Sequence, residues 1–137
     1  MNTVKVEVVT PERVVYSGEA NLVVARGADG ELGILANHIP MVTPLKIAPV
    51  QIKKPGNQED LIAVSGGFLE IRKDKITILA ESAELPQDID VNRAQAAKER
   101  AERRMAESRR EELDFKRAQL ALQRALVRIQ VGGKGNK

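Results

Sequence analysis

The sequence contains no cysteine or tryptophan, and it has one histidine, one tyrosine and two phenylalanines. Without cysteine the chain cannot form a disulfide, a thiolate metal site or a thiol nucleophile. Aromatic residues make up only 2% of the chain, which argues against an aromatic ligand pocket or a base-stacking surface. The single histidine, His38, has no second His or Cys to share a metal ion, so we predict no metal site.

Long hydrophobic runs are also missing. No stretch approaches the roughly 18–20 apolar residues that span a membrane. The first residues, Met1 to Lys5, lack the charged and then apolar plan of a secretory signal. We therefore expect a soluble protein of a cytosol-like compartment.

Glycine and proline are absent from Gln87 to Val131, although the chain holds ten glycines and six prolines. This separates two predicted domains, a turn-rich domain over residues 1–86 and a helix-forming domain over residues 87–137, which we call the arm. Residues 88–137 hold 13 Lys or Arg against 8 Asp or Glu, a net charge of +5, whereas residues 1–87 carry a net charge of −2. A basic arm of this kind predicts an acidic partner.

The first domain alternates apolar and polar residues in short runs, which is the pattern of half-buried strands. Turn residues interrupt these runs about every ten positions. We therefore predict an α+β protein, with an N-terminal flattened antiparallel β-sandwich of about 8–10 strands and a C-terminal antiparallel two-helix hairpin. The clearest β-hairpin is Phe68–Ala80, which turns at Lys73–Asp74.

Two stretches, Gly30–Pro40 and Val64–Phe68, interrupt the strand pattern. In the first, we predict that His38 bonds the backbone of a turn, with contact to a partner as the alternative. In the second, Gly66 and Gly67 predict a bulge or a close approach between strands. They do not predict a phosphate loop, because no Gly-Lys-Ser/Thr sequence follows them.

Helix signals divide the arm into two segments. Pro86 ends the strand-rich domain, and Asp88 or Asp90 offers a carboxylate to cap a first helix. The Ser-x-x-Glu capping box at residues 108–111 predicts that a second helix begins at about Arg109.

The second helix is predicted to stop at Gly132–Gly133, followed by a flexible tail from Lys134 to Lys137. Apolar residues at helical spacing predict the faces that the helices turn toward each other. These residues are Ala94, Ala97, Ala101 and Met105 on the first helix, and Phe115, Ala118, Leu122, Ala125, Leu126 and Ile129 on the second. Because the turn contains no Gly, Pro or Asn, the hairpin and a straightened arm would differ by roughly a few kcal/mol. A permanent hairpin packed on the sandwich is the alternative.

Arginines follow the helical period on both segments of the arm, outside the apolar faces. They are Arg93, Arg100 and Arg104 on the first segment and Arg117, Arg124 and Arg128 on the second. Such arginines can be solvated partners of nearby Glu and Asp side chains. Two arginine faces brought together by a hairpin can instead bind a polyphosphate, and the sequence leaves both readings open.

Several motifs occur in an order found in one protein family. They are Val9-Thr10-Pro11, Gly30-Glu31-Leu32-Gly33-Ile34-Leu35, His38-Ile39-Pro40, Val64-Ser65-Gly66-Gly67-Phe68-Leu69-Glu70, Thr77-Ile78-Leu79-Ala80 and Arg117-Ala118 through Leu122. Over residues 3–131 the chain resembles epsilon subunits of bacterial and chloroplast F-type ATP synthases. The resemblance implies a non-catalytic central-stalk subunit of a proton-translocating complex, peripheral on the cytoplasmic face of the cell membrane.

The resemblance also implies partners. The sandwich would bind the gamma subunit and rest on the c-ring, with Glu31 against the ring and His38 facing gamma or the ring. The arm would either fold against the sandwich or extend beside gamma to an acidic region of the beta subunits in the alpha/beta head. In the extended position it would inhibit ATP hydrolysis.

Some bacterial members of this family bind ATP as a regulatory ligand on the folded hairpin, through the motif Ile/Leu-Asp-x-x-Arg-Ala. The segment Ile89-Asp90-Val91-Asn92-Arg93-Ala94 matches this motif in full. The resemblance therefore implies an ATP site formed by Glu84, Ile89, Asp90, Arg93, Ala94, Arg124 and Arg128. A carboxylate near a helix start would read the adenine amino group, and the arginines would bind the phosphates.

Two other functions stay open at this stage. Basic helices suit a nucleic-acid-binding module, although the scarcity of aromatics and the interleaved glutamates count against it. A small hydrolase or transferase would need a nucleophile and a base, and His38 has no Ser or Cys partner at catalytic spacing.

Overall fold

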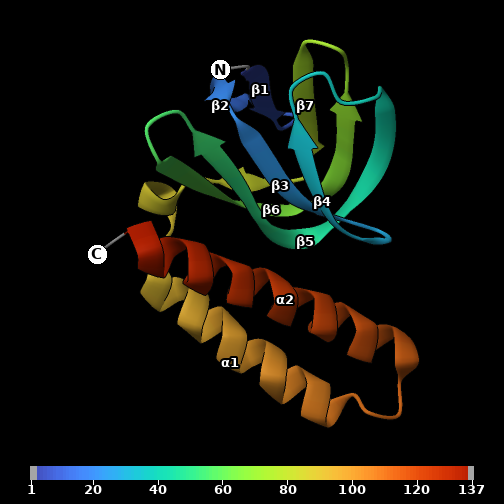
Figure 1. Cartoon of the computed structure of the whole chain (residues 1–137). Helices are drawn as coiled ribbons and strands as arrows, with labels where there is room; N and C mark the ends of the chain where they lie inside the picture. Colours follow the sequence, from blue (N-terminus) through green and yellow to red (C-terminus); the bar gives the residue numbers. More distant parts are fainter. Residues whose placement is uncertain (1–2, 136–137) are drawn as a thin grey trace.

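The computed structural model describes residues 3–135, which form a folded sheet with two helices packed on one side (Figure 1). The strands are β1 (Val4–Val9), β2 (Val14–Ala20), β3 (Leu22–Gly27), β4 (Gly30–Leu35), β5 (Met41–Lys54), β6 (Gln58–Ile71), β7 (Lys75–Ala80) and β8 (Ala83–Glu84). A 3₁₀ turn, η1 (Pro86–Asp88), leads to the helices α1 (Val91–Glu107) and α2 (Glu112–Gly135). The predicted sandwich followed by a helical hairpin is confirmed.

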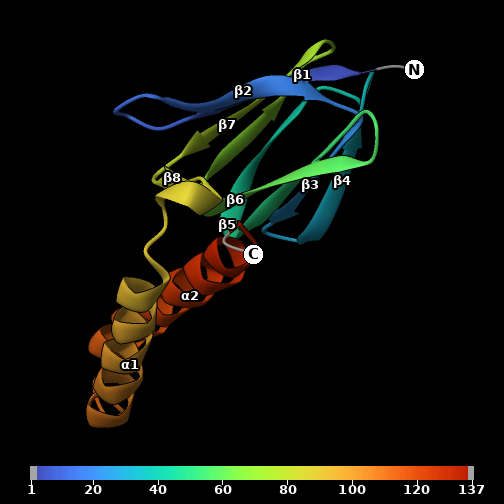
Figure 2. The same ribbon diagram turned by 90° about the vertical axis from the view of Figure 1, so that its left-hand side faces the viewer.

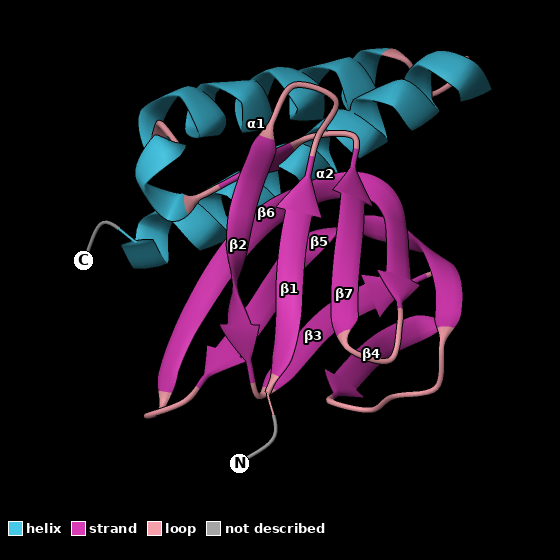
Figure 3. Cartoon of the chain, turned by 90° about the horizontal axis from the view of Figure 1, so that it is seen from above, coloured by secondary structure: helices cyan, strands magenta, loops and turns pink. Residues whose placement is uncertain are grey.

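All eight strands belong to one hydrogen-bonded sheet, with the order β2-β1-β7-β6-β5-β3-β4 and with β8 paired to β6. The strands β5 and β6 have 14 residues each, and they curve so that the sheet folds back on itself (Figure 3). One detail departs from the antiparallel plan, because β1 pairs with β7 in parallel. Alternation at period two is the same for both strand directions, so the sequence pattern did not distinguish them.

The core of the sandwich comes from every second residue of its strands. On β1 the inward side chains are Val4, Val6 and Val8, and on β7 Ile76 and Ile78 are fully buried. Among residues 3–135, the buried members of this cluster all come from strands, and Ala36 of the β4–β5 loop and Leu85 before η1 pack against it, with no residue of either helix. The sandwich therefore has a core that does not depend on the arm.

The predicted hairpin Phe68–Ala80 is confirmed by the antiparallel pairing of β6 and β7. Gly67, which precedes this hairpin and pairs with Ala80, has φ 126°, and a Cβ there would lie 2.1 Å from the carbonyl oxygen of Leu79. The predicted close approach between strands is thus confirmed. The stretch Gly30–Leu35, which the pattern left unassigned, forms the edge strand β4. Only Ile34 of that strand is buried, which explains why its alternation is faint.

The two helices of the arm form an antiparallel hairpin, and α2 lies between α1 and the sandwich (Figure 2). On the predicted faces Ala94, Ala101, Ala118 and Ala125 are buried. Leu126 is 45% exposed, so its assignment to the buried face was wrong. The physical reason is that α2 packs on two sides. One face contacts α1, and a second apolar stripe, which includes Val127 and Val131, contacts the sandwich, so a single periodic face does not describe its burial.

The start of α2 also differs from the prediction. Ser108 ends α1 by donating its backbone N–H to the carbonyl of Arg104, and α2 begins at Glu112 rather than Arg109. Residues 108–111 are needed to reverse the chain, because two packed helices have axes about 8–10 Å apart. The Ser-x-x-Glu sequence therefore belongs to the turn and does not cap a helix at Ser108.

Gly132 and Gly133 do not stop α2, which continues to Gly135. The predicted tail therefore begins inside the helix, and its residues 136 and 137 lie outside the described part of the chain. Two adjacent glycines lower helix propensity but do not prevent a helix that tertiary packing supports.

Candidate functional site

A hollow of about 420 Å³ lies where the sandwich, both helices and the linker between η1 and α1 (Ile89 and Asp90) meet. We call it the hollow. Its lining comprises Glu84, Asp88, Ile89, Asp90, Arg93, Ala94, Ala97, Arg100 and Arg128. Because these residues come from β8, η1, the linker, α1 and α2, the hollow exists only while the arm is folded against the sandwich.

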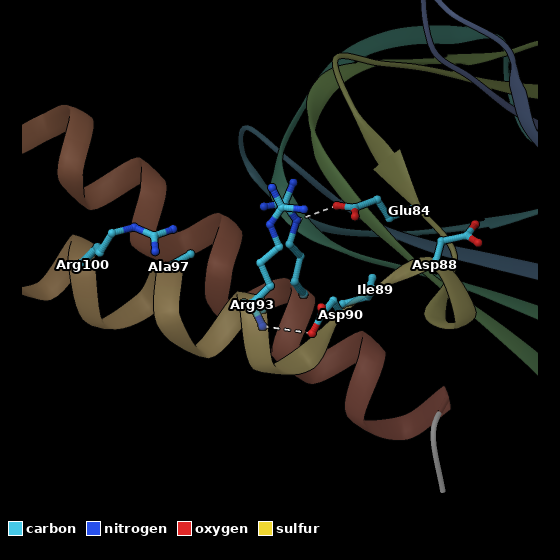
Figure 4. Close-up of a pocket in the computed structure, with 9 residues that line it drawn as sticks. Glu84, Asp88, Ile89, Asp90, Arg93, Ala97 and Arg100 are labelled. Atoms are coloured by element: carbon cyan, nitrogen blue, oxygen red, sulfur yellow. Dashed lines mark hydrogen bonds and ion pairs between the residues drawn. The ribbon is translucent and has the colours of Figure 1, made fainter.

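The lining combines three carboxylates, three guanidinium groups and small or apolar side chains. Figure 4 shows Glu84 and Asp88 on the sandwich side, Arg93 near the middle, and Arg100 farther along α1. Ala97 lies between the two arginines on the same helix and leaves space beside them. The carboxylates therefore lie toward the sandwich, where Arg128 pairs with Glu84, and Arg100 lies at the far end of the hollow.

The matched Ile-Asp-x-x-Arg-Ala motif, residues 89–94, spans the linker and the first turn of α1. Asp90 is the N-cap of α1, and its Oδ1 accepts a hydrogen bond from the backbone N–H of Arg93 at 3.1 Å. Ile89 is only 6% exposed and packs in an apolar cluster with Ala63 and with Val127 of α2. The side chain of Arg93, on the same first turn, is exposed and lines the hollow.

Glu84 and Arg128 connect the sandwich to the arm across the hollow. The Nε of Arg128 donates to Glu84 Oε1 at 2.5 Å, and both side chains remain about one third exposed. An ion pair this accessible contributes about 1 kcal/mol or less. It therefore orients both groups in the hollow more than it stabilises the fold.

The structure brings together six of the seven residues predicted for the ATP site. Arg124 is the exception, because it lines a separate, larger hollow of about 760 Å³ with Arg26 and Lys46. The motif missed Asp88, Ala97 and Arg100. Arg100 lies seven residues after Arg93, which is two helical turns along the same face, and the helical spacing of the arginines had already placed both on one candidate phosphate-binding face.

The two predicted partner-contact residues lie away from the hollow. Glu31 is an exposed residue of β4, opposite Arg26 of β3. His38 lies in the loop between β4 and β5, where its Nδ1 donates to the carbonyl of Ile39 at 2.7 Å. The prediction of a turn histidine bonded to backbone is confirmed, and its contact with a partner stays a prediction.

Side chains with shifted pKa values also lie outside the hollow. Burial, with a hydrogen bond to Asp60, raises the pKa of Tyr16. The hydrogen bond from Lys75 lowers the pKa of Glu7, and a hydrogen bond shared with Asp114 raises that of Glu111. None of these three residues lines the hollow. Among residues 3–135 no three His, Cys, Asp or Glu side chains gather as a metal site requires.

Neither helix of the described chain is long and apolar enough to cross a membrane.

Comparison with known proteins covers both domains. Residues 3–86 match the family model of the ATP synthase delta/epsilon chain beta-sandwich domain. Residues 87–133 match that of the delta/epsilon chain long alpha-helix domain. A chain of the Euglena gracilis mitochondrial ATP synthase structure (OSCP, F1 and c-ring) superposes with a TM-score of 0.76 at 20% identity. That match covers 88% of this chain and 76% of that one, and it supports the fold.

Curated relatives are much more similar in sequence. The ATP synthase epsilon chain of Halalkalibacterium halodurans is 54% identical over 134 residues, which are 98% of this chain and 100% of that protein. The ATP synthase epsilon chain of Brevibacillus brevis is 66% identical over 107 residues, which are 78% of this chain and 81% of that protein. The chain therefore belongs to the family of ATP synthase epsilon chains.

Proposed function

We propose that this chain is a non-catalytic, regulatory subunit in the central stalk of a proton-translocating F-type ATP synthase. Its sandwich is the permanent docking part. Its arm folds against the sandwich or extends toward the alpha and beta subunits, and the extended arm inhibits ATP hydrolysis. The observation that carries this proposal is the hollow, because sandwich, linker and both helices build it together and only the folded arm contains it.

ATP is the ligand that best fits the chemistry of the hollow. Carboxylates on its sandwich side can accept hydrogen bonds from the adenine amino group. Arg93 and Arg100 form no ion pair within residues 3–135, so both guanidinium groups are available for phosphate oxygens. A volume of about 420 Å³ lies within the range of small-molecule sites.

Because ATP in this proposal binds only when the arm is folded, its binding opposes inhibition. A ligand at a hundredfold excess over its Kd stabilises the form that binds it by about 2.7 kcal/mol. That is enough to move a nearly balanced equilibrium toward the folded arm. ATP is then an effector that removes inhibition when it is abundant, and no turnover by this chain is required.

The outer face of the sandwich supports docking to the gamma subunit. Register pairs place Pro44, Phe68, Leu79, Val9 and Val14 side by side across five neighbouring strands. Phe68, Leu79 and Val14 are each at least 50% exposed. A continuous exposed apolar row of this kind is typical of a protein interface.

The extended arm and the edge of the sandwich account for the remaining partners. A net charge of +5 over residues 88–137 suits an acidic region of the beta subunits. Glu31 and His38, on β4 and in the loop that follows it, are placed in this proposal against the c-ring and gamma. The subunit would accordingly be peripheral on the cytoplasmic face of the cell membrane.

The ATP site is tested by calorimetric titration of the full chain. Arg93→Ala and Arg100→Ala should each weaken ATP binding at least about tenfold, because each removes a charged phosphate partner. Arg103→Ala is the matched control, since Arg103 is an exposed arginine of α1 outside the hollow. Asp90→Ala is less informative, because it also removes the N-cap of α1. Unchanged affinity in both hollow variants would refute the site.

A further inference from the structure

Gly132 of α2 lies against Ile89 of the linker and Val91, the first residue of α1. A Cβ at this position would lie 2.9 Å from Ile89 Cγ2 and 3.0 Å from Val91 Cγ2. The next residue, Gly133, has nothing within 4 Å of the corresponding point. Both glycines are inside α2, so ending the helix does not explain either of them.

The contact at Gly132 cannot relax cheaply. Ile89 and Val91 are β-branched, and such side chains have few χ1 rotamers. Ile89 is also confined by its neighbours, since it packs with Ala63 of β6 and with Val127 and Val131 of α2. A methyl group at position 132 must therefore push α2 away from the linker.

We propose that Gly132 is the latch of the arm: because it has no side chain, α2 packs closely on Ile89 and Val91 at the start of the arm, and Ile89 in turn packs with Ala63 of the sandwich, so the arm stays folded against it. The latch deepens the proposed function, because it rests on an arm that can leave the sandwich. It also connects to the ATP site through Ile89, which lines the hollow and touches the latch at once. Loosening the latch therefore displaces part of the hollow.

The pair Gly132→Ala and Gly133→Ala separates the latch from helix propensity. Both changes replace glycine with alanine in the same helix, so both favour the helix to a similar extent. Only the first inserts a methyl group into the contact with Ile89 and Val91. Any difference in arm position between the two variants therefore reports on the contact.

The position of the arm can be measured by spin labels in the full chain, which has no native cysteine. Lys46→Cys on β5 and Gln123→Cys on α2 give two exposed sites, which both line the larger hollow that also contains Arg124, between sandwich and arm. Pulsed dipolar spectroscopy should show one short distance in the parent and in Gly133→Ala. Gly132→Ala should lose at least half of that short-distance population, with unchanged strand content by circular dichroism. Identical distance distributions in all three would overturn the proposal.

Testing Gly132→Ala in a protein that also carries Ile89→Ala distinguishes the specific contact from a general disturbance of the arm. Ile89→Ala removes the nearer of the two methyl groups that a side chain at 132 would strike and leaves that of Val91, so Gly132→Ala should change the distances less in this background than in the parent. An equal loss in both backgrounds would contradict the latch. The spin-label result does not depend on inhibition. If the arm is released and hydrolysis stays uninhibited, the latch stands and the proposed inhibitory function fails.

Discussion

The sandwich and the arm differ in how they are held. Among residues 3–135, the sandwich gathers nineteen buried apolar residues in one cluster, whereas the cluster that joins the arm to it has four, which are Ala63 of β6 and the arm residues Ile89, Val127 and Val131. Full burial of one large apolar side chain stabilises a fold by about 1.5–3 kcal/mol before entropy is counted. We therefore expect the small cluster to open without unfolding the large one, as the proposed movable arm requires.

The largest effect should come from a glycine of the sandwich. Gly67→Ala would place a methyl group 2.1 Å from the carbonyl oxygen of Leu79, at a backbone φ of 126°. We expect the paired strands to separate locally and stability to fall by more than about 3 kcal/mol, since strain and steric overlap add. Urea denaturation followed by circular dichroism measures the change.

Gly30→Ala is the control for Gly67→Ala. Gly30 has nearly the same φ, 127°, but nothing lies within 4 Å of its added Cβ. Its cost should be backbone strain alone, about 1–3 kcal/mol. If the two variants were equally stable, the close approach of β6 to β7 would not be a determinant of the sandwich.

A smaller effect should come from the contact between arm and sandwich. Val131→Ala removes a fully buried side chain of the four-residue cluster, so we expect docking of α2 to weaken by about 1–3 kcal/mol. Hydrogen exchange should increase in α2 while the sandwich core keeps its protection. Leu113→Ala, at a position 64% exposed, should change neither. Equal loss of protection in both domains would show that they unfold as one unit.

The ion pair between Glu84 and Arg128 should contribute less again. Since both side chains are about one third exposed, a double-mutant cycle with Glu84→Gln and Arg128→Gln should give a coupling of about 1 kcal/mol or less. The coupling should shrink as salt is raised. A coupling above about 2 kcal/mol would make this pair, rather than the apolar cluster, the main connection of the arm.

The smallest predicted effect is confined to alkaline pH and to the sandwich. The folded state raises the pKa of Tyr16 above its usual value of 10.0, through burial and the hydrogen bond to Asp60. Its contribution is therefore complete below pH 10 and is lost as pH rises above 10, because the unfolded tyrosine ionises first. Denaturation curves between pH 8 and 11 should show this slope in the parent and a weaker one in Tyr16→Phe. Equal slopes would remove Tyr16 as the cause.

The sequence predicted the sandwich and the hairpin well because periodic burial determines both. Ala94 and Ala101 recur on one face of α1, and Ile76 and Ile78 alternate on β7, so local spacing was enough. Leu126 was misassigned because α2 carries two apolar stripes, and one period cannot describe both. Val131 belongs to the second stripe, which only the position of the sandwich reveals.

The site was predictable where a motif lies on one helix start, as for Asp90 and Arg93. The sequence did not distinguish Arg128 from Arg124, because that difference depends on how α2 is rotated against the sandwich. That rotation places Arg128 in the hollow and Arg124 in its neighbour, although the two are one turn apart. The close contact at Gly132 could not be predicted either, because it is made with Ile89, which is distant in the sequence.

The most direct test of the account is ATP hydrolysis by an F-type catalytic complex that lacks this subunit. The full chain would be added back with its arm free, with its arm cross-linked to the sandwich through Lys46→Cys and Gln123→Cys, or shortened to end at Pro86. We predict inhibition by the free arm only, with the cross-linked and shortened chains still bound to the complex. Equal rates with all three chains would contradict the claim that a detachable arm on a fixed sandwich is the inhibitor.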